Sequence, residues 1–502
     1  MQRQARRGLA AFVVLAAVVL TATAWSAAAP ASTAPAATAH AARTVDSFTW
    51  GGGLGDQMGA LPAFRRYRMH ATFYVPSGLV CQPGPAPGCA HSPYLTLGDV
   101  RQIAADGNEI GGLSVQHVPL AGVPAAEAQR EICDDRVNLT RWGFRVTDFA
   151  YPFAQVNQTL QDLARRCGYN SALGTGQLRG AGLCLHCAWA ETIPPRNPYL
   201  LRTPIEVNSV GTTWSPATFE KIVTGAQQHG GGWIIFTIHD VCARACALGV
   251  TRPELDSVLG WLARHAGPGV SVRTVRQVIG GPVRPAVAGP APRPIPPPGV
   301  VNSRLSAVAA GGIPACFQAG RYGTNHATFR YQRRAGPGGA GAEAISLTQR
   351  KSGTAQIVPT MDLGACAPAA AAGRRYTLGA WYKSSGPVVF NTYYRTAAGT
   401  WAFWVSSPPL AASRGWTQGT WTAPAVPAGA TAVSFGLALR SDGTLATTRY
   451  SLAPVRYTST RLIVFGVLVA AALIALFGVR RARRPLIPPP GDLGQQPPRA
   501  RP

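Results

Sequence analysis

The chain has 502 residues, 46% of them hydrophobic, and a formal net charge of +26 at pH 7. This length and apolar content allow more than one folded domain, each with its own core. The surplus of cations, nearly all arginine, favours polyanionic partners, but the sequence has no zinc finger, basic helical run or aromatic RNA-binding signature, which argues against nucleic acid.

The N-terminal segment has the pattern of an export signal. Three arginines precede an apolar run over 9–20, and small residues follow with an A-x-A cleavage site at 39–41. A basic, an apolar and a small-residue region in this order are typical of secretory signals. We therefore expect residues 1–43 to be a signal peptide and small-residue linker, either cleaved or kept as an anchor.

The ten cysteines agree with export, because disulfides persist in oxidising compartments. Eight lie in the first large region and two in the second, and even counts suit pairing within each region. Two close pairs are predicted, Cys81 with Cys89 and Cys242 with Cys246. The remaining connectivity stays open.

Cys184 and Cys187 form a C-x-x-C pattern. A structural zinc site would need two further ligands, and the chain has no second C-x-x-C. In an oxidising compartment the spacing therefore favours a disulfide or a loop over a metal site.

Residues 44–280 are predicted to form one α/β domain. Short apolar runs with strand character lie at 45–50, 71–75, 147–153 and 233–239. Helical patterns lie between them: near 96, at 124–142, at 157–167, from Ser215 and from Thr251. Strands alternating with helices predict a largely parallel sheet or barrel.

Two different patterns follow this domain. Residues 281–300 are rich in proline, which predicts an extended, semi-rigid spacer because proline fixes φ and lacks an N–H donor. Residues 301–456 show short alternating runs between Gly, Pro and Ser turns, and this predicts an antiparallel β-sandwich. The runs lie at 344–349, 376–383, 388–394, 401–405, 416–422 and 432–439.

An uninterrupted apolar run of 18 residues, 462–479, lies near the C-terminus. At ~1.5 Å per residue it is just long enough to cross the hydrocarbon of a membrane. Four arginines follow within 480–484, and positive charge beside a span stays cytoplasmic. The sequence thus predicts one transmembrane helix at 460–480, a basic, Pro-rich cytoplasmic tail at 481–502, and a cell-membrane protein whose bulk is extracellular.

The turn at 49–53 reads Thr-Trp-Gly-Gly-Gly, and Ala-Thr-Phe-Tyr-Val follows at 71–75. This arrangement resembles the start of a polysaccharide deacetylase domain (the NodB-homology, carbohydrate esterase family 4-like group), whose turn reads T-F-D-D-G. The resemblance implies a distorted (β/α) barrel. It places the family's catalytic base at Gly51 and one of its metal ligands at Gly52.

A second block extends the resemblance. Residues 107–120 read G-N-E-I-G-G-L-S-V-Q-H-V-P-L, similar to the family's G-H-E-I-G-x-H-(S/T)-x-x-H-x-x-L. The two metal-binding histidines of that pattern fall at Leu113 and His117. Of the three implied metal ligands, only His117 remains.

Two later blocks complete the resemblance. Residues 149–154 follow the family's F-x-x-P-x-G pattern, which implies substrate contacts from Tyr151 and Pro152. The strand at 233–239 ends at His239, followed by Asp240, in the position of the family's catalytic acid motif.

In the family, a divalent metal held by one Asp and two His polarises the acetamide carbonyl, an Asp activates the bound water, and a His protonates the leaving amine. The resemblance implies that this scaffold lacks the base and two of the three ligands. Three protein ligands are the usual minimum for a catalytic metal. We therefore predict no cofactor, and a protein that binds or organises cell-envelope polysaccharide or peptidoglycan.

The alternative is an active carbohydrate deacetylase, a C–N hydrolase with a rearranged site for zinc or another divalent metal. Asp46, Asp56 or Glu109 would then join His117 and His239. The simpler interpretations are a solvated strand-end Asp, an N-cap Asp, a surface Glu and two hydrogen-bonded histidines lining an old cleft.

Residues 301–456 resemble jelly-roll carbohydrate-binding modules, on the sequences Y-T-L-G-A-W-Y-K at 376–383 and F-N-T-Y-Y-R at 390–395. Such modules stack aromatic rings on sugar rings. Trp401 and Trp404 follow the turn at 398–400 and are the predicted sugar contacts. They belong to a set of seven candidates, of which alternation along strands predicts that at least half are structural. The set is Trp381, Tyr393, Tyr394, Trp401, Trp404, Trp416 and Trp421.

Overall fold

The computed structural model describes residues 42–82, 89, 92–180, 183–204, 215–244, 246–266, 269–292, 294–296 and 299–455. The predicted signal segment up to residue 41, the predicted membrane helix and the predicted cytoplasmic tail lie outside these residues. No helix within the described ranges combines the length and the hydrophobicity that a membrane crossing requires.

The first domain is built on an eight-stranded sheet in which the paired strands run parallel. At its centre, β1 (Thr44–Trp50) pairs along its length with β7 (Gly232–Ile238), at its start with β10 (Val270–Val272) and at its end with β2 (Thr72–Val75). The order then continues through β3 (Glu109–Gly112), β4 (Asp148–Ala150), β5 (Ser171–Leu178) and β6 (Leu201–Pro204).

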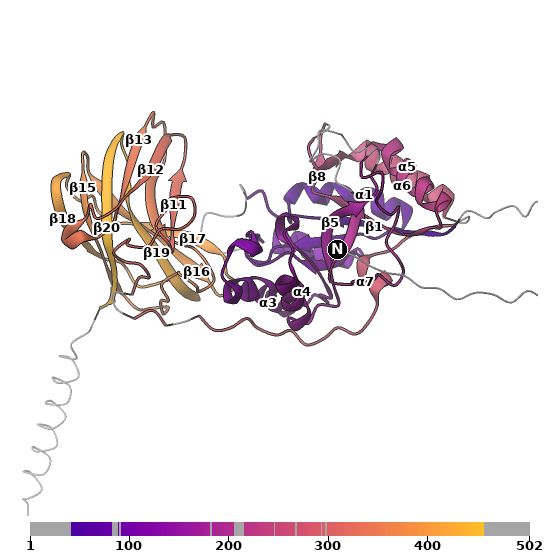
Figure 1. The fold of residues 1–502 in the computed structure, drawn as a ribbon, viewed down its shortest axis with the longest axis horizontal. Helices are drawn as coiled ribbons and strands as arrows, with labels where there is room; N and C mark the ends of the chain where they lie inside the picture. The colour runs from indigo at the N-terminus through magenta and orange to yellow at the C-terminus, as the bar shows by residue number, and fades with distance from the viewer. Residues whose placement is uncertain are drawn as a thin grey trace, which may run out of the picture. The chain divides into compact units, whose positions relative to one another are not determined.

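Six α-helices lie between strands of this domain in the described part of the chain, and a seventh, α7 (Val275–Ile279), follows β10. The six are α1 (Leu61–Tyr67), α2 (Leu97–Ala105), α3 (Ala125–Arg141), α4 (Gln158–Arg166), α5 (Pro216–Gln228) and α6 (Arg252–His265). Figure 1 shows α5 beside α6 and α3 beside α4. A small ribbon of β8 (Asp240–Cys242) and β9 (Gly249–Thr251) follows β7. The predicted α/β class is confirmed.

The helices begin where their capping residues predict. Thr96 and Asp99 form a capping box at α2, and Thr251 and Glu254 form one at α6. In each box the Thr hydroxyl accepts from a first-turn N–H, while the carboxylate accepts from the N-cap N–H. Ser215 caps α5.

Alternation along β1 fixes which side chains can reach the interior of the domain. Phe48 and Trp50 pack in the large core on the helix side, and Asp46 shares their face because residues two apart on a strand do. Val45 packs instead against the smaller inner cluster that contains Leu113. Gly51 follows β1 on this inner face.

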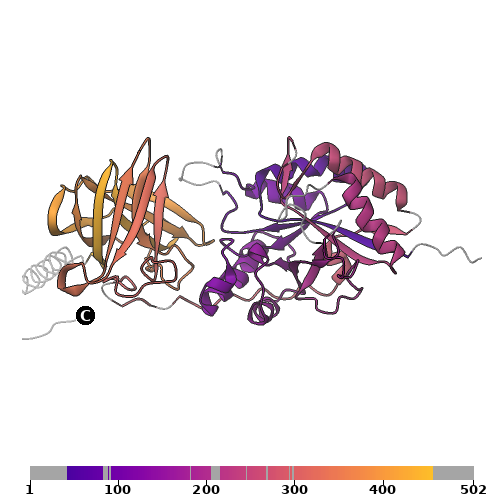
Figure 2. The same cartoon turned by 45° about the horizontal axis from the view of Figure 1, so that its top comes forward.

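The second domain is a sandwich of two five-stranded antiparallel sheets, seen as two layers in Figure 2. One sheet runs β11 (Phe317–Tyr322), β14 (Thr354–Pro359), β19 (Ala430–Leu439), β16 (Val388–Thr396), β17 (Trp401–Ser406). The other runs β12 (His326–Gln332), β13 (Ala342–Thr348), β20 (Gly443–Pro454), β15 (Tyr376–Ser384), β18 (Ser413–Thr422). Their inner faces share one apolar core, as expected of a sandwich.

The described part of the proline-rich linker forms no helix or strand, and it is hydrogen-bonded to the first domain. Arg136 of α3 donates to the carbonyl oxygens of Arg284 (2.6 Å) and Pro285 (2.9 Å). The N–H of Gly289 donates to Asp134 at 2.7 Å. Proline offers carbonyl acceptors but no N–H, so α3 and its neighbours supply most of the donors.

Five disulfides close within the two domains: Cys81–Cys89, Cys133–Cys167, Cys184–Cys187, Cys242–Cys246 and Cys316–Cys366. Both predicted close pairs are confirmed, and the C-x-x-C motif is a disulfide.

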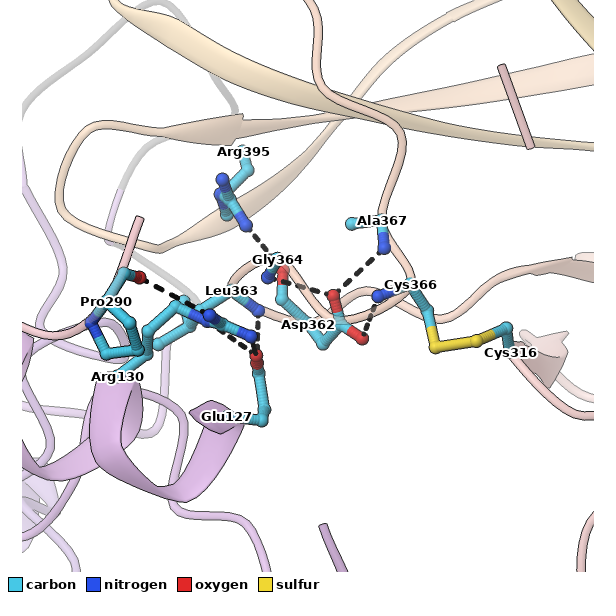
Figure 3. A network of polar contacts seen from close by, with 10 residues as sticks. All are labelled: Glu127, Arg130, Pro290, Cys316, Asp362, Leu363, Gly364, Cys366, Ala367 and Arg395. Carbon is cyan, nitrogen blue, oxygen red and sulfur yellow. Dashed lines mark hydrogen bonds and ion pairs between the residues drawn. A yellow bond between two sulfur atoms is a disulfide. The ribbon is translucent and has the colours of Figure 1, made fainter. Parts of the chain in front are cut away.

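The last disulfide lies in a loop ordered by one carboxylate, shown in Figure 3. Asp362 accepts hydrogen bonds from the N–H groups of Gly364 (3.1 Å), Cys366 (2.8 Å) and Ala367 (2.9 Å). Arg395 donates to the Asp362 carbonyl oxygen at 2.7 Å. This loop directly follows Met361, which lines a groove of the sandwich described below.

Candidate functional site

A cleft of about 490 Å³ opens at the carboxyl ends of β1, β4, β5 and β7. Parallel α/β sheets place their ligand sites at this edge. Seven of the residues singled out from the sequence line it: Gly51, Gly52, Leu113, His117, Tyr151, Pro152 and His239. The motifs therefore converge on one place, although they lie far apart in the chain.

At the position of the family's base, the ring of His239 packs over Gly51. A Cβ atom on Gly51 would lie 3.2 Å from both Cδ2 and Nε2 of that ring. Gln57 holds the two segments together, because its Nε2 donates to the carbonyl oxygens of Gly51 (2.6 Å) and His239 (2.7 Å). A carboxylate at 51 would fit only if the imidazole moved.

The following turn is shaped for glycine. Gly52 has φ +94° and Gly53 has φ +61°, conformations that L side chains rarely adopt. A Cβ atom on Gly53 would also lie 2.7 Å from Cδ of Pro76. The position of the family's first metal ligand therefore holds a backbone turn with no donor side chain.

The two histidine positions of the family are occupied very differently. Leu113 is 4% exposed and packs in the apolar inner cluster. His117 adopts φ +53°, and its N–H donates to the hydroxyl of Ser114 at 3.0 Å. Its ring lies against Phe153, with the ring centroids 4.7 Å apart. Only one imidazole faces the cleft from this segment.

Burial lowers the pKa of both His117 and His239 below the ordinary value for histidine. The neighbouring His239 lowers the pKa of His117 further, whereas the carboxylate of Asp240 acts on the pKa of His239 in the opposite direction. Both rings are therefore neutral at pH 7. Each can donate one hydrogen bond and accept one, which suits hydroxyl and amide groups of an uncharged sugar.

Two of the alternative carboxylates lie away from the cleft. Asp46 precedes Gly51 by five strand residues, roughly 16 Å at ~3.3 Å per residue, and it faces the helix side of the sheet. Burial raises the pKa of Asp46 to about 8. Glu109 lies at the start of β3, where it accepts hydrogen bonds from the Thr72 hydroxyl (2.9 Å) and the Arg276 N–H (2.8 Å).

The third carboxylate, Asp56, pairs with another acid. It lies in a 3-10 turn (Gly55–Ala60). Burial first and the nearby Asp240 second raise the pKa of Asp56 to about 6. Neither carboxylate is among the residues that line the cleft.

The described residues do not fit the metal that the family uses. They contain no group of three or more His, Cys, Asp and Glu side chains arranged to hold an ion. At the family's ligand positions they offer two glycyl or aliphatic residues and one imidazole. No reaction step through a metal follows from this geometry.

Aromatic side chains supply much of the remaining cleft wall. The hydroxyl of Tyr151 donates to the Tyr199 carbonyl oxygen at 3.0 Å, so its proton is already used within the domain. Phe153, 58% exposed, was missed from the sequence although it lies in the F-A-Y-P-F-A block. Its left-handed backbone (φ +55°) follows Pro152 and turns the ring toward His117.

The two tryptophans predicted as sugar contacts are separated by the structure. Trp401 lines a groove of about 500 Å³ on the sheet that contains β17, together with Tyr322, Tyr393 and Phe403. Trp404 packs against the core of the sandwich instead. The groove lies on the face of the sheet opposite that core, since Tyr394 and Phe390 of β16 point inward.

Polar side chains form the floor of this groove. The amide of Gln356 donates to the Tyr393 hydroxyl (2.7 Å) and accepts from Asn391 (3.0 Å), which in turn accepts from Ser406 (2.7 Å). The ring of Tyr322 stacks on Tyr393 at 5.8 Å. Exposed rings above a fixed amide network are suited to stacking and hydrogen bonding with a sugar.

Comparison with known protein families supports the resemblance that the cleft motifs carry. The family model for polysaccharide deacetylases matches residues 53–172. This region belongs to the polysaccharide deacetylase family. The match begins at Gly53, directly after Gly51 and Gly52, and it covers the Leu113 and His117 block and the strand β4. A search of curated proteins found no match.

Solved structures of deacetylases resemble the chain only distantly. The peptidoglycan deacetylase PdaC of Bacillus subtilis is 17% identical, with 47% of this chain and 90% of that chain covered and a TM-score of 0.29. A family 4 carbohydrate esterase of Streptomyces lividans is 15% identical, with 50% and 98% covered and a TM-score of 0.29. The assignment of this deacetylase region therefore rests on the family model and on the parallel sheet.

Proposed function

We propose that this protein is a membrane-anchored, extracellular member of the deacetylase group that lacks metal-dependent activity and binds or organises cell-envelope glycans, polysaccharide or peptidoglycan. The single observation that carries the proposal is the cleft itself. It keeps the family's position and its histidines His117 and His239, but it has glycine and leucine where the base and two ligands would be.

The chemistry of the cleft supports binding rather than hydrolysis. Two neutral imidazoles and the rings of Tyr151 and Phe153 can hold an uncharged sugar. No carboxylate among the lining residues can activate water. The groove around Trp401 supplies a second place for the same class of ligand. The signal segment and the apolar run at 462–479 support export and anchoring.

The proposal is tested by acetate release. Full-length protein purified in a non-ionic detergent is incubated with chitohexaose and with peptidoglycan fragments, each with added zinc, cobalt or manganese. We expect acetate to stay at the level of a protein-free control, because neither a base nor a metal cage is present. Metal-dependent acetate release that His239→Ala abolishes would contradict the proposal and establish the active deacetylase.

A further inference from the structure

The positive charge of the chain is not shared equally by its two domains. Residues 44–280 contain 19 Lys and Arg against 17 Asp and Glu, so the first domain is nearly neutral. Residues 301–455 contain 14 Lys and Arg against three acids, Glu343, Asp362 and Asp442. The attraction for polyanions therefore belongs to the sandwich.

A trough of about 490 Å³ crosses the sheet of β12, β13, β20, β15 and β18, on the face turned away from the core. Its floor consists of the small side chains Ala344 and Ser346 of β13 and Ala446 of β20. The alternate residues Ile345 and Leu347 point into the core, as the period of two requires.

Strand register places cations on both sides of this floor. Arg330 lies opposite Ala344, Ala344 opposite Ala446, and Ala446 opposite Lys383, so one row crosses four strands. Strands about 4.8 Å apart put the two cationic strands roughly 14 Å from one another. Arg414 of β18 adds a third cation to the lining.

A second row, adjacent to the first, carries hydroxyl groups. Thr328 lies opposite Ser346, and Ser346 lies opposite Thr444. Ser384 and Ser413, which pair across β15 and β18, also border the trough, but their hydroxyls donate to the carbonyl oxygens of Gly386 and Gly415. The trough thus combines cations with side chains that can both donate and accept hydrogen bonds.

The three acids of the sandwich do not neutralise these cations. Glu343 is fully buried, and Asp362 accepts from the three backbone N–H groups of its own loop. Asp442 accepts from the N–H of Arg350 at 3.0 Å. In the described ranges no ion pair involves Arg330, Lys383 or Arg414. Lys383 instead lies 5.4 Å from the centre of the Trp416 ring.

We infer that this trough, defined by Arg330, Lys383, Arg414 and the hydroxyl row, is a binding site for an anionic, carboxylate-bearing glycan chain. Charge complementarity selects the anion, and the recessed floor with its hydroxyl row matches sugar hydroxyls. A membrane surface fits less well, because the large exposed apolar side chains of the described residues all lie outside this lining. The site deepens the proposed glycan binding but depends only on the sandwich, not on the cleft.

The test uses full-length protein in a non-ionic detergent. The ligand is polygalacturonate, and fully methyl-esterified polygalacturonate is the uncharged control ligand. Binding is measured by calorimetry at low and at physiological salt. We expect polygalacturonate to bind at least tenfold more tightly than the ester, and this difference to shrink as salt rises. The triple variant Arg330→Ser, Lys383→Ser, Arg414→Ser should bind polygalacturonate at least tenfold more weakly than the wild type.

A matched control removes the same charge elsewhere. Arg321→Ser, Lys351→Ser, Arg374→Ser changes exposed residues that line neither groove, and it should keep affinity within twofold. Equal loss in both variants, or equal binding of the ester, would overturn the site. The site would also be overturned if the wild type bound no polygalacturonate but bound short-chain phosphatidylglycerol micelles, and the trough variant lost that micelle binding. None of these results changes the expected outcome of the acetate assay, so failure of this site and failure of the proposed function can be told apart.

Discussion

The cleft of the first domain and the two grooves of the sandwich differ in the charge of their domains and in the side chains that line them. The cleft lies in a domain with almost balanced charge, and its lining holds neutral histidines beside glycine, leucine and aromatic rings. The sandwich carries a large excess of cations and builds its grooves on open sheet faces. The comparison thus sets a cleft with glycine and leucine at the family's base and ligand positions against a sandwich whose open sheet faces carry cations and aromatic rings.

The first way to sharpen this comparison uses two tryptophans of one strand, β17. Trp401→Ala should weaken the binding of a neutral oligosaccharide such as chitohexaose about tenfold, or ~1.4 kcal/mol, because an aromatic platform is removed from the groove. Calorimetric titration of the full-length protein measures the change.

Trp404→Ala is the matched control. Its ring packs against the sandwich core, so its loss should lower the free energy of unfolding by about 2 kcal/mol while leaving the affinity within twofold. Urea unfolding followed by circular dichroism measures stability. If Trp404→Ala loses binding and Trp401→Ala does not, the groove has been assigned to the wrong face of the sheet.

A smaller effect concerns the buried acids, most of which belong to the deacetylase region. Burial raises the pKa of Asp46, Glu131 and Asp148 to about 8 each, whereas in the sandwich it raises the pKa of Glu343 to about 7. Between about pH 4 and pH 8 the unfolded chain releases these protons and the folded chain keeps them. The free energy of unfolding should therefore fall as pH rises through this range.

Asp46→Asn tests this directly, because the amide has the shape of the acid without its proton. At pH 8 the variant should be more stable than the wild type by at least about 1 kcal/mol, and the difference should become small near pH 4. Asp256→Asn, which removes a surface pair with Arg66, should change stability by less than ~0.5 kcal/mol at either pH. A wild type whose stability is constant from pH 4 to pH 8 would contradict the assignment.

Local signals predicted much of the fold. Helix starts at Thr96, Ser215 and Thr251 are set by contacts within four residues, so the sequence alone sufficed. The strands β11, β12 and β14 were not predicted. Their sequences mix polar and apolar residues, and β12 is half-exposed along its length, so its pairing with β13 defines it rather than its own composition.

For the candidate site, too, local features could be predicted from the sequence and long-range contacts could not. Missing donors at Gly51, Gly52 and Leu113 could be read from the motifs. Gln57 donates hydrogen bonds to the ends of two strands that lie more than 180 positions apart in the chain. No local sequence pattern predicts these contacts. The row that aligns Arg330 with Lys383 depends on the register of four strands. Register of this kind is fixed by packing across the sandwich.

The most direct test of the central claim is the zinc content of the full-length protein after dialysis against zinc and removal of the excess. The account predicts less than about 0.1 zinc per chain, because among the described residues His117 belongs to no group of three or more potential ligands. About one zinc per wild-type chain, lost in His117→Ala, would contradict the account.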